Sequence, residues 1–224
     1  MKDQFKVKNT LGKTVLLEWE YLEPDSPQFN QKIRSLSDIL VHTYTQMELQ
    51  FSQTYPQAVP NEFFLKSLAP FIKAGENIDW LLIEAKIKDI FQQFFATTDF
   101  SQFAKSNETY LFIVAKDLET GNPLGLIQFL ISPEFGDDVV KVCYFGIMPI
   151  AQNQGLDKIL MSTIFKLLPD TRRIFLHTRS SNQKAIETYR AWGFKQFNES
   201  TPNWPDFEYI TKNSTQLQML ALEV

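Results

Sequence analysis

The sequence has little cysteine, histidine or glycine: one, two and eight residues respectively among 224. A single cysteine, Cys143, excludes an intramolecular disulfide and argues against a cysteine-built metal site. Basic residues form no run and the formal net charge is −4, which disfavours nucleic acid as a partner. No apolar stretch has the length of a membrane span, and residues 1–6 have no apolar core, so we expect neither a membrane segment nor a signal peptide. We therefore expect a cytoplasmic protein.

Apolar and aromatic residues are well supplied. Hydrophobic residues make up 44% of the chain and charged residues 21%, which is typical of a globular protein with a sizeable core. Phenylalanine is used 20 times. We interpret these rings as core residues; the alternative is that some of them line an apolar substrate channel.

The first half of the chain predicts one strand followed by helices. Residues 14–21 (TVLLEWEY) are typical of a strand. Apolar residues at helical spacing predict helices over 26–51, 61–73 and 78–97. Pro70 lies close to the end of the second of these helices.

From Tyr110 onward the pattern changes to short strands interrupted by two helices, an α/β arrangement with antiparallel and parallel parts. The predicted helices span 154–168 and 182–192. The predicted strands span 110–116, 124–131, 139–148, 173–178, 194–198, 207–211 and 216–223.

Three smaller signals accompany these elements. Gly146 inside a strand predicts a bulge. Ser180 and Gln183 have the spacing of a capping box at the start of the second helix. Gly193 stands where a helix commonly ends with a left-handed glycine.

Residues 146–158 (GIMPIAQNQGLDK) read as a strand, a short loop and a glycine at the start of a helix. Such a junction exposes unpaired backbone N–H groups at the positive end of the helix dipole, which favours a phosphate or pyrophosphate. Gly155 permits close approach of the anion. Taken alone, the pattern is equally compatible with a glycine that merely opens a helix. Walker and Rossmann patterns are absent, so a nucleoside triphosphate or NAD site is not expected.

A second segment, residues 181–194, places Asn182 and Tyr189 two helical turns apart on one face. Ala185 lies between them, where a small side chain leaves room for a ligand. The alternative is a core helix with a packed tyrosine.

Together the two segments resemble the GNAT acetyltransferase superfamily. That family's phosphate loop is Arg or Gln, two residues, Gly, one residue, then Gly or Ala, and it appears here as the segment from Gln152 to Asp157. The family's later pattern of Asn, Ala, Tyr and Gly-Phe is matched by Asn182, Ala185, Tyr189, Gly193 and Phe194. The resemblance covers Tyr110 to the C-terminus together with the first predicted strand, 14–21.

The resemblance implies an α/β fold with a mixed, mainly antiparallel central sheet, helices on both faces and a helical insertion between the first two strands. The chain would then be a single domain, 1–224, with an enlarged helical segment at 26–107 and an acyl-CoA-binding core at 108–224. The helical segment has room for three helices where the family has about two. We interpret the extra helix as a substrate-side lid, a dimer surface or a plain packing addition.

The resemblance also implies an acyl-CoA-dependent N-acyltransferase. The enzyme would transfer acetyl from acetyl-CoA to a small-molecule or peptide amine by direct attack in a ternary complex, without a metal, as a monomer or homodimer. The alternative is a non-catalytic module of the same fold that binds acyl-CoA or a protein partner.

The implied site residues follow from the matched motifs. Tyr189 would protonate the departing thiolate, since a phenol stays protonated at neutral pH. The pantetheine arm would lie between the strands 139–148 and 173–178. The implied coenzyme-binding residues are Ile147, Met148, Gln152, Asn153, Gln154, Gly155, Leu156, Asp157, Lys158, Asn182, Ala185 and Tyr189.

The match has two departures. Asp157 replaces a small residue of the phosphate loop, where its carboxylate either repels the pyrophosphate or points to solvent. Lys141 stands where some relatives have a glutamate base, so the candidates for a base are Asp138, Tyr144 and His177. Cys143 is expected to be inert. Two lysines, Lys158 and Lys184, are either contacts to a coenzyme phosphate or solvated surface residues.

Overall fold

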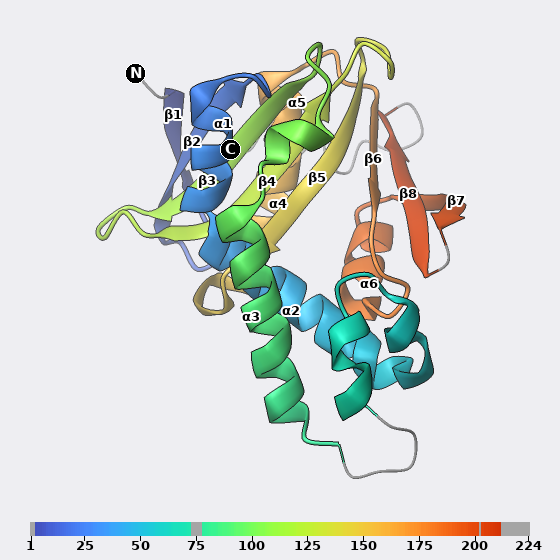
Figure 1. Cartoon of the computed structure of the whole chain (residues 1–224). Helices are drawn as coiled ribbons and strands as arrows, with labels where there is room; N and C mark the ends of the chain where they lie inside the picture. The colour runs from blue at the N-terminus through green and yellow to red at the C-terminus, as the bar shows by residue number, and fades with distance from the viewer. Residues whose placement is uncertain (1–2, 73–77, 202, 212–224) are drawn as a thin grey trace.

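The computed structural model describes residues 3–72, 78–201 and 203–211. Its strands form one eight-stranded sheet in the order β1-β2-β3-β4-β5-β6-β8-β7 (Figure 1). Only β5 and β6 pair in parallel; the other neighbouring pairs are antiparallel. The strands are β1 (Asp3–Lys8), β2 (Thr14–Leu22), β3 (Thr109–Asp117), β4 (Pro123–Ile131), β5 (Val139–Ile147), β6 (Arg173–His177), β7 (Lys195–Thr201) and β8 (Trp204–Ile210).

Helices cover both faces of this sheet (Figure 1). One face carries α1 (Pro27–Ser35), α2 (Ser37–Thr54) and α3 (Trp80–Thr97); the other carries α4 (Leu156–Ser162), α5 (Ile164–Leu167) and α6 (Gln183–Ala191). Four 3₁₀ helices complete the described elements: η1 (Pro56–Asn61), η2 (Lys66–Phe71), η3 (Phe100–Phe103) and η4 (Pro149–Ala151).

Two apolar cores lie on the two faces of the sheet. Leu111 and Ile113 of β3 pack into the core under α4 to α6, whereas Phe112 and Val114 pack into the core under α1 to α3. Successive side chains of a strand point to opposite faces, so a strand covered on both sides is apolar throughout. This explains why β3, β4 and β5 were predictable as short apolar runs, and the expected mixed sheet with helices on both faces is confirmed.

The helical segment departs from the sequence prediction in two places. The helix predicted over 26–51 is two helices, because the chain breaks at Leu36, whose φ of −111° and ψ of 8° are not helical. The helix predicted over 61–73 is wrong. Only 3₁₀ turns form there, and Pro70, which has no N–H to donate, lies inside η2.

The second half of the chain also corrects several predictions. The helix predicted over 154–168 is divided at Thr163, where the Ser162 and Thr163 hydroxyls donate to the Ile159 carbonyl at 3.1 and 2.7 Å and compete with the helix ladder. The edge strand β1 was not predicted, because only Val7 among its residues is buried. The strand expected at 216–223 lies outside the described residues.

A bulge was predicted at Gly146, but it lies at Cys143, three residues earlier in β5. Gly146 pairs regularly with Leu126, whereas the register between β4 and β5 shifts so that Cys143 is the extra residue. Gly146 serves another purpose. A Cβ there would collide with the side chain of Thr43 and lie 3.0 Å from Ile39 Cγ2, so the glycine allows α2 to pack directly on β5.

The start of α6 is not a capping box. Asn182 is the N-cap residue and makes no side-chain cap bond, while Gln183 Nε2 donates to the Ser180 carbonyl at 2.6 Å. Gly193 has a φ of +95°, as predicted for a residue that ends a helix.

The parallel pair β5–β6 opens along its length. Hydrogen-bonded register is limited to the first residues of each strand, Val139 to Lys141 opposite Arg173 to Phe175. Beyond Lys141 and Phe175, β5 continues to Ile147 and β6 to His177 without pairing with each other. The gap lies between the two segments that the sequence singled out, since one follows β5 and the other follows β6.

Candidate functional site

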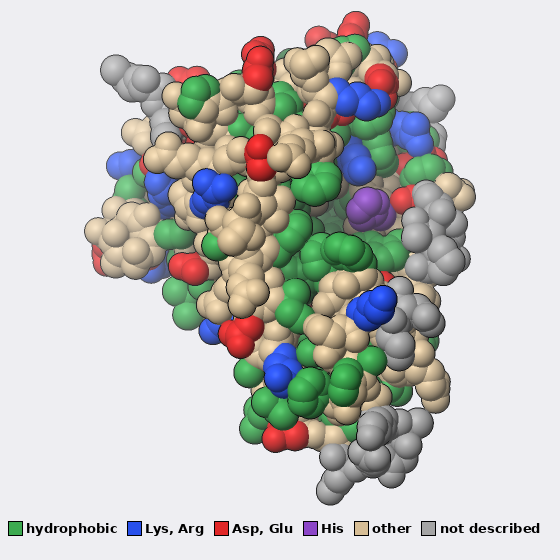
Figure 2. Space-filling model, in the orientation of Figure 1, with side chains coloured by type: hydrophobic (Ala, Val, Ile, Leu, Met, Phe, Trp, Pro, Cys, Tyr) green, Lys and Arg blue, Asp and Glu red, His purple; other side chains and the backbone are tan. Residues whose placement is uncertain are grey.

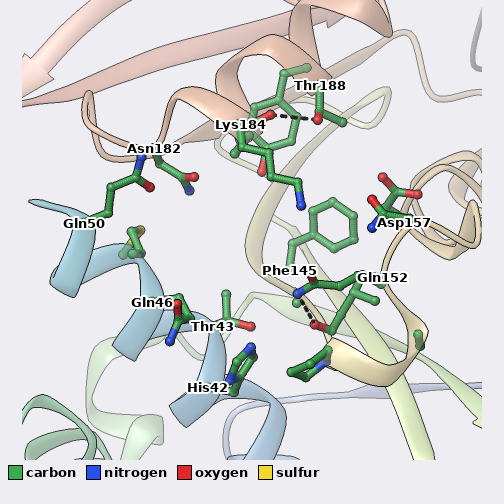
Figure 3. A pocket seen from close by; sticks show the side chains of 18 of the residues that line it. His42, Thr43, Gln46, Gln50, Phe145, Gln152, Asp157, Asn182, Lys184 and Thr188 are labelled. Atoms are coloured by element: carbon green, nitrogen blue, oxygen red, sulfur yellow. Dashed lines mark hydrogen bonds between the residues drawn. The ribbon is translucent and has the colours of Figure 1, made fainter. Parts of the chain in front are cut away.

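A cavity of about 890 Å³ lies where β5 has parted from β6 (Figure 3). Its lining comes from five elements: α2, the end of β5, η4 with the loop after it, the first turn of α4, and α6. The two sequence segments, 146–158 and 181–194, therefore both contribute to the lining of one cavity, and α2 forms a further wall.

The phosphate-type loop has the predicted local geometry. Gly155 is the N-cap of α4 with a φ of +71°. The first bond of the helix ladder runs from the Ile159 N–H to the Gly155 carbonyl at 3.1 Å, so the N–H groups of residues 156–158 precede the ladder and have no helical acceptor. These groups and the positive helix end can hold an anion.

A brace from the N-terminal hairpin supports this loop. The Thr10 N–H donates to the Gln154 carbonyl at 3.0 Å, and Asn9 Nδ2 donates to Gln154 Oε1 at 2.8 Å. Gln154 Nε2 in turn donates to the Ile150 carbonyl at 2.7 Å. A Cβ on Gly155 would lie 2.6 Å from Thr10 Cγ2, so the close approach that requires glycine is made by the protein's own turn.

The predicted coenzyme residues divide into two groups. Seven line the cavity: Ile147, Gln152, Asn153, Asp157, Asn182, Ala185 and Tyr189. The other five do not line it. Met148 packs into the core under α1 to α3, Leu156 is 1% exposed in the opposite core, and Gln154 forms the brace. Gly155 is the N-cap of α4 and Lys158 lies in its first turn, so their backbone N–H groups are at the positive end of the helix.

Tyr189 stands with its ring in the core and one edge on the cavity. The side chain is 8% exposed and its ring packs against Trp192 and Phe194, with centroids 5.9 and 5.8 Å apart. Burial raises the pKa of the Tyr189 phenol, and the negative charge of Asp157 raises that pKa further. The phenol is therefore protonated throughout the physiological pH range and can serve as a proton donor.

The wall supplied by α2 was not predicted. Figure 3 shows Gln50 of α2 and Asn182 facing one another across the cavity, with Thr43 and Gln46 further along the same helix. Asn182 Nδ2 donates to Thr178 Oγ1 at 3.2 Å. The signal that could have found this wall is a row of polar residues at helical spacing, Thr43, Gln46, Gln50 and Gln53.

A buried ion pair fixes that wall against the loop before α6. Arg179 Nε and Nη2 lie 3.0 and 2.8 Å from the two carboxylate oxygens of Glu48, and Nη1 lies 2.9 Å from Glu62 Oε2. The guanidinium also stacks over Phe51 and Trp204, 4.1 and 4.5 Å from the ring centroids. The Arg179 and Glu48 side chains are 3% and 2% exposed, so this arginine cluster was beyond prediction from local pattern.

The candidate bases lie off the cavity lining. Asp138 is 3.9 Å from Arg172, and His177 Nδ1 is 3.9 Å from Asp206. The pKa of His177 is lowered by burial, and by the positive charge of Lys141, against the opposing effect of Asp206, so its imidazole is neutral at neutral pH. Tyr144 is a half-buried phenol whose pKa is raised by desolvation.

The Cys143 thiol is not activated as a nucleophile. Burial raises the pKa of the Cys143 thiol to about 12, so the thiol is protonated and unreactive, as expected. Among the described residues, no three His, Cys, Asp or Glu side chains are grouped to hold a metal ion. Within the same ranges, no helix is both long and apolar enough to cross a membrane.

Two lysines lie beside the cavity. Lys184 lines it, and Figure 3 shows its ammonium group directed into the space beside Phe145 and Asp157. Lys158 does not line it. The cavity therefore carries one carboxylate and one ammonium group among its charged linings, Asp157 and Lys184.

Solved structures similar to the chain include the GNAT domain of PAT from S. lividans, at 16% identity with 92% of the chain and 96% of that domain covered and a TM-score of 0.48. The PaiA N-acetyltransferase of Thermoplasma acidophilum, in complex with coenzyme A, is 13% identical over 87% of this chain and 98% of that one, with a TM-score of 0.45. Spermidine N-acetyltransferase from Vibrio cholerae, in complex with CoA and spermine, is 13% identical over 88% and 96%, with a TM-score of 0.44.

No curated protein matches the chain in sequence. The family model described as the acetyltransferase (GNAT) family matches residues 77–194, slightly more than half of the chain. This range contains both motifs, the splayed strands and most of the cavity lining. The chain therefore belongs to the GNAT acetyltransferase family.

Proposed function

We propose that the protein is an acyl-CoA-dependent N-acyltransferase that transfers acetyl from acetyl-CoA to a primary amine. The observation that carries the proposal is the convergence of the phosphate-type loop, the gap between β5 and β6, and Tyr189 on one cavity. A cavity of about 890 Å³ falls in the size range of cofactor sites.

The coenzyme would lie along three parts of this cavity. The N–H groups of residues 153–158 hold the pyrophosphate at the start of α4. The pantetheine arm follows Ile147, at the end of β5, into the gap between the strands. Asn182 donates to the arm from α6, and Ala185 leaves space for it because its side chain is small. Lys158 and Lys184 remain candidates for the 3′-phosphate.

The chemistry is a direct transfer. The nitrogen lone pair of the amine attacks the thioester carbonyl carbon, and the tetrahedral intermediate collapses as the carbon–sulfur bond breaks. The departing thiolate takes the phenolic proton of Tyr189, and the amine nitrogen gives up one proton. The neutral imidazole of His177 is the favoured acceptor for that proton, which reaches it through water. The Tyr189 phenolate is then reprotonated by solvent water.

Calorimetric titration with acetyl-CoA, with a thermal-shift scan in coenzyme A, tests the first half of the proposal. We expect micromolar binding and a raised melting temperature, because a ligand selective for the folded state stabilises it. Absence of binding at millimolar coenzyme would contradict the proposal.

The variant Tyr189→Phe tests the second half. The ring and its packing stay, so coenzyme affinity should change by less than about twofold. Turnover should fall by about 10²-fold or more, the usual contribution of a general acid. Unchanged turnover in a steady-state thiol-release assay would remove Tyr189 from the mechanism.

Asp157 favours a second candidate, a non-catalytic module that binds acyl-CoA or a protein partner. Its carboxylate lines the cavity at the position where the family's phosphate loop has Gly or Ala. Tight coenzyme binding without transfer to any amine in a broad panel would support a sensor of acyl-CoA. Neither binding nor transfer would support a protein-binding role.

A further inference from the structure

A second concave region lies on the face of the sheet that carries α1 to α3, beside the gap between β5 and β6. Ile174 and Leu176 of β6 point into the core under α4 to α6, so Phe175 and His177 point to the other face. Lys141 of β5 is the Cα partner of Phe175, and Tyr144 packs on the α1 to α3 side. Figure 2 shows that this face is hollowed, with hydrophobic side chains in the hollow. We call this region, defined by Lys141, Tyr144, Phe175 and His177, the acceptor hollow.

The bulge at Cys143 connects the hollow to the coenzyme cavity. Because of the extra residue, Cys143 and Tyr144 both pack on the α1 to α3 side, and Phe145 returns to the opposite side, where it lines the cavity. Tyr144 and Phe145 are neighbours in the chain, so one strand separates the two spaces. Beyond Lys141 the gap between β5 and β6 joins them.

Aromatic rings make up the walls of the hollow. Tyr144 contacts Tyr44, with ring centroids 6.2 Å apart. Phe175 contacts Phe135 at 5.0 Å, and His177 contacts Trp204 at 5.5 Å. All of these side chains are partly or largely exposed, His177 by 47%. Rings that stay accessible in a concave region favour a flat apolar ligand, because stacking and burial of apolar surface both contribute.

Lys141 supplies one unpaired positive charge among these rings. Within the described part of the chain no carboxylate lies within ion-pair distance of it. Two nearby acids are paired, Glu208 with Arg173 at 2.8 Å and Glu134 with Lys105 at 2.5 Å, and Asp206 lies 3.9 Å from His177 Nδ1. The Lys141 charge reaches both strands, since it lowers the pKa of His177 on β6 and of Cys143 on β5. Such a site attracts an anionic group and repels a polycation.

We propose that the acceptor hollow takes a primary amine that also carries a carboxylate and an aromatic body, with Lys141 binding the carboxylate. This inference rests on the proposed acetyl transfer and names its acceptor class. The amine points toward the gap beside Tyr144, and the carboxylate lies toward Lys141, three residues back along β5. Three residues of strand span about 10 Å, a distance that the lysine side chain shortens. Aromatic amino acids and short peptides ending in one have this arrangement, and polyamines do not.

The experiment compares acids with their amides. The kcat/KM of the full chain is measured with acetyl-CoA for phenylalanine, glycyl-phenylalanine, the C-terminal amide of each, and spermine. The same panel is run for Lys141→Met, Lys141→Arg and, as a matched control, Lys6→Met, whose lysine is exposed on the far edge strand β1. We expect the wild-type chain and Lys6→Met to prefer at least one acid over its amide by tenfold or more, and over spermine by more. Lys141→Met should reduce the acid-over-amide preference to twofold or less, and Lys141→Arg should keep it.

A binding arm separates the two proposals. N-acetylphenylalanine, the product of the expected reaction, is titrated calorimetrically into each variant, with coenzyme A titrated in parallel. Product binding that Lys141→Met weakens at least tenfold, with coenzyme affinity unchanged, supports the hollow as the carboxylate site. Transfer to spermine or to the amides in preference to the acids overturns the acceptor class and leaves the proposed function intact. If coenzyme A does not bind the wild-type chain, the proposed function is wrong. The titration with N-acetylphenylalanine then tests the acceptor hollow by itself, and absence of binding would contradict the proposed carboxylate site.

Discussion

The motif-bearing core at 108–224 and the helical segment at 26–107 encode their structures in different ways. In the core, β3 and β4 are buried on both faces and appear in the sequence as continuous apolar runs. In the helical segment, α2 buries Thr45, Glu48 and Ser52 together with its apolar residues, so its inward face is not apolar throughout. The structure of the motif-bearing core can therefore be predicted from local sequence pattern. The packing of the helical segment that lines the cavity depends instead on contacts with residues more than a hundred positions away.

The largest effect is expected at the joint between these two regions. Arg179→Met leaves Glu48 buried without its partner and should lower the free energy of unfolding by about 3–5 kcal/mol. Replacing both residues, by Glu48→Leu with Arg179→Met, should cost less than the single change, since no buried charge is then left. Urea denaturation measures both. As a control, Lys105→Met removes an ion pair whose side chains are 57% and 54% exposed and should cost less than about 1 kcal/mol. Equal losses for the two single variants would contradict the role of the arginine cluster.

The second effect concerns the direct contact of α2 with β5. Gly146→Ala places a methyl group against Thr43 and should cost about 1–3 kcal/mol, as overpacking usually does. Adding Thr43→Ala should recover part of that loss, because it removes the nearest clash and leaves Ile39. Urea denaturation of the single and double variants gives the coupling. A harmless Gly146→Ala would show that α2 is free to move away from the strand.

A third, smaller effect is expected at the phosphate-type loop of the core. Asp157→Ala removes a negative charge from the cavity lining, so coenzyme A should bind about tenfold more tightly, or by about 1.4 kcal/mol. Calorimetry at low ionic strength measures this, and the gain should shrink in higher salt as charges are screened. Unchanged affinity for both Asp157→Ala and Asp157→Asn would place the carboxylate away from the coenzyme phosphates.

The smallest effect is a titration shift in the acceptor hollow. Burial and the Lys141 charge both lower the pKa of His177, so Lys141→Met should raise that pKa part of the way toward its ordinary value, observable by NMR. Because the folded-state pKa is below the unfolded one, protonation favours the unfolded chain. The free energy of unfolding should therefore fall as the pH drops below the ordinary histidine value of about 6.5, and the fall should be smaller in the variant. An identical titration in both proteins would show that the Lys141 charge does not affect the pKa of His177.

The sequence predicts most of the core elements and, from its two motifs, seven residues that line the cavity: Ile147, Gln152, Asn153, Asp157, Asn182, Ala185 and Tyr189. It fails where local backbone effects override the hydrophobic period, and where the decisive interaction is tertiary. The break at Leu36, the 3₁₀ turns around Pro70 and the division of the helix at Thr163 depend on local competition that a hydrophobic period does not register. The α2 wall and the Arg179–Glu48 pair join residues separated by 131 positions, and no local pattern carries such a contact.

The hydrogen bonds from Asn9 and Thr10 to Gln154 attach the outermost hairpin to the loop that precedes α4. An edge strand normally frays most easily, and its amides exchange with solvent early. Here fraying of β1 would break these hydrogen bonds and release the loop that precedes α4. Opening of the hairpin and release of the loop are therefore thermodynamically coupled. A ligand that holds the loop must then slow hydrogen exchange at the Thr10 amide, far along the chain from any residue it touches. The N-terminal hairpin thereby reports the occupancy of the cavity.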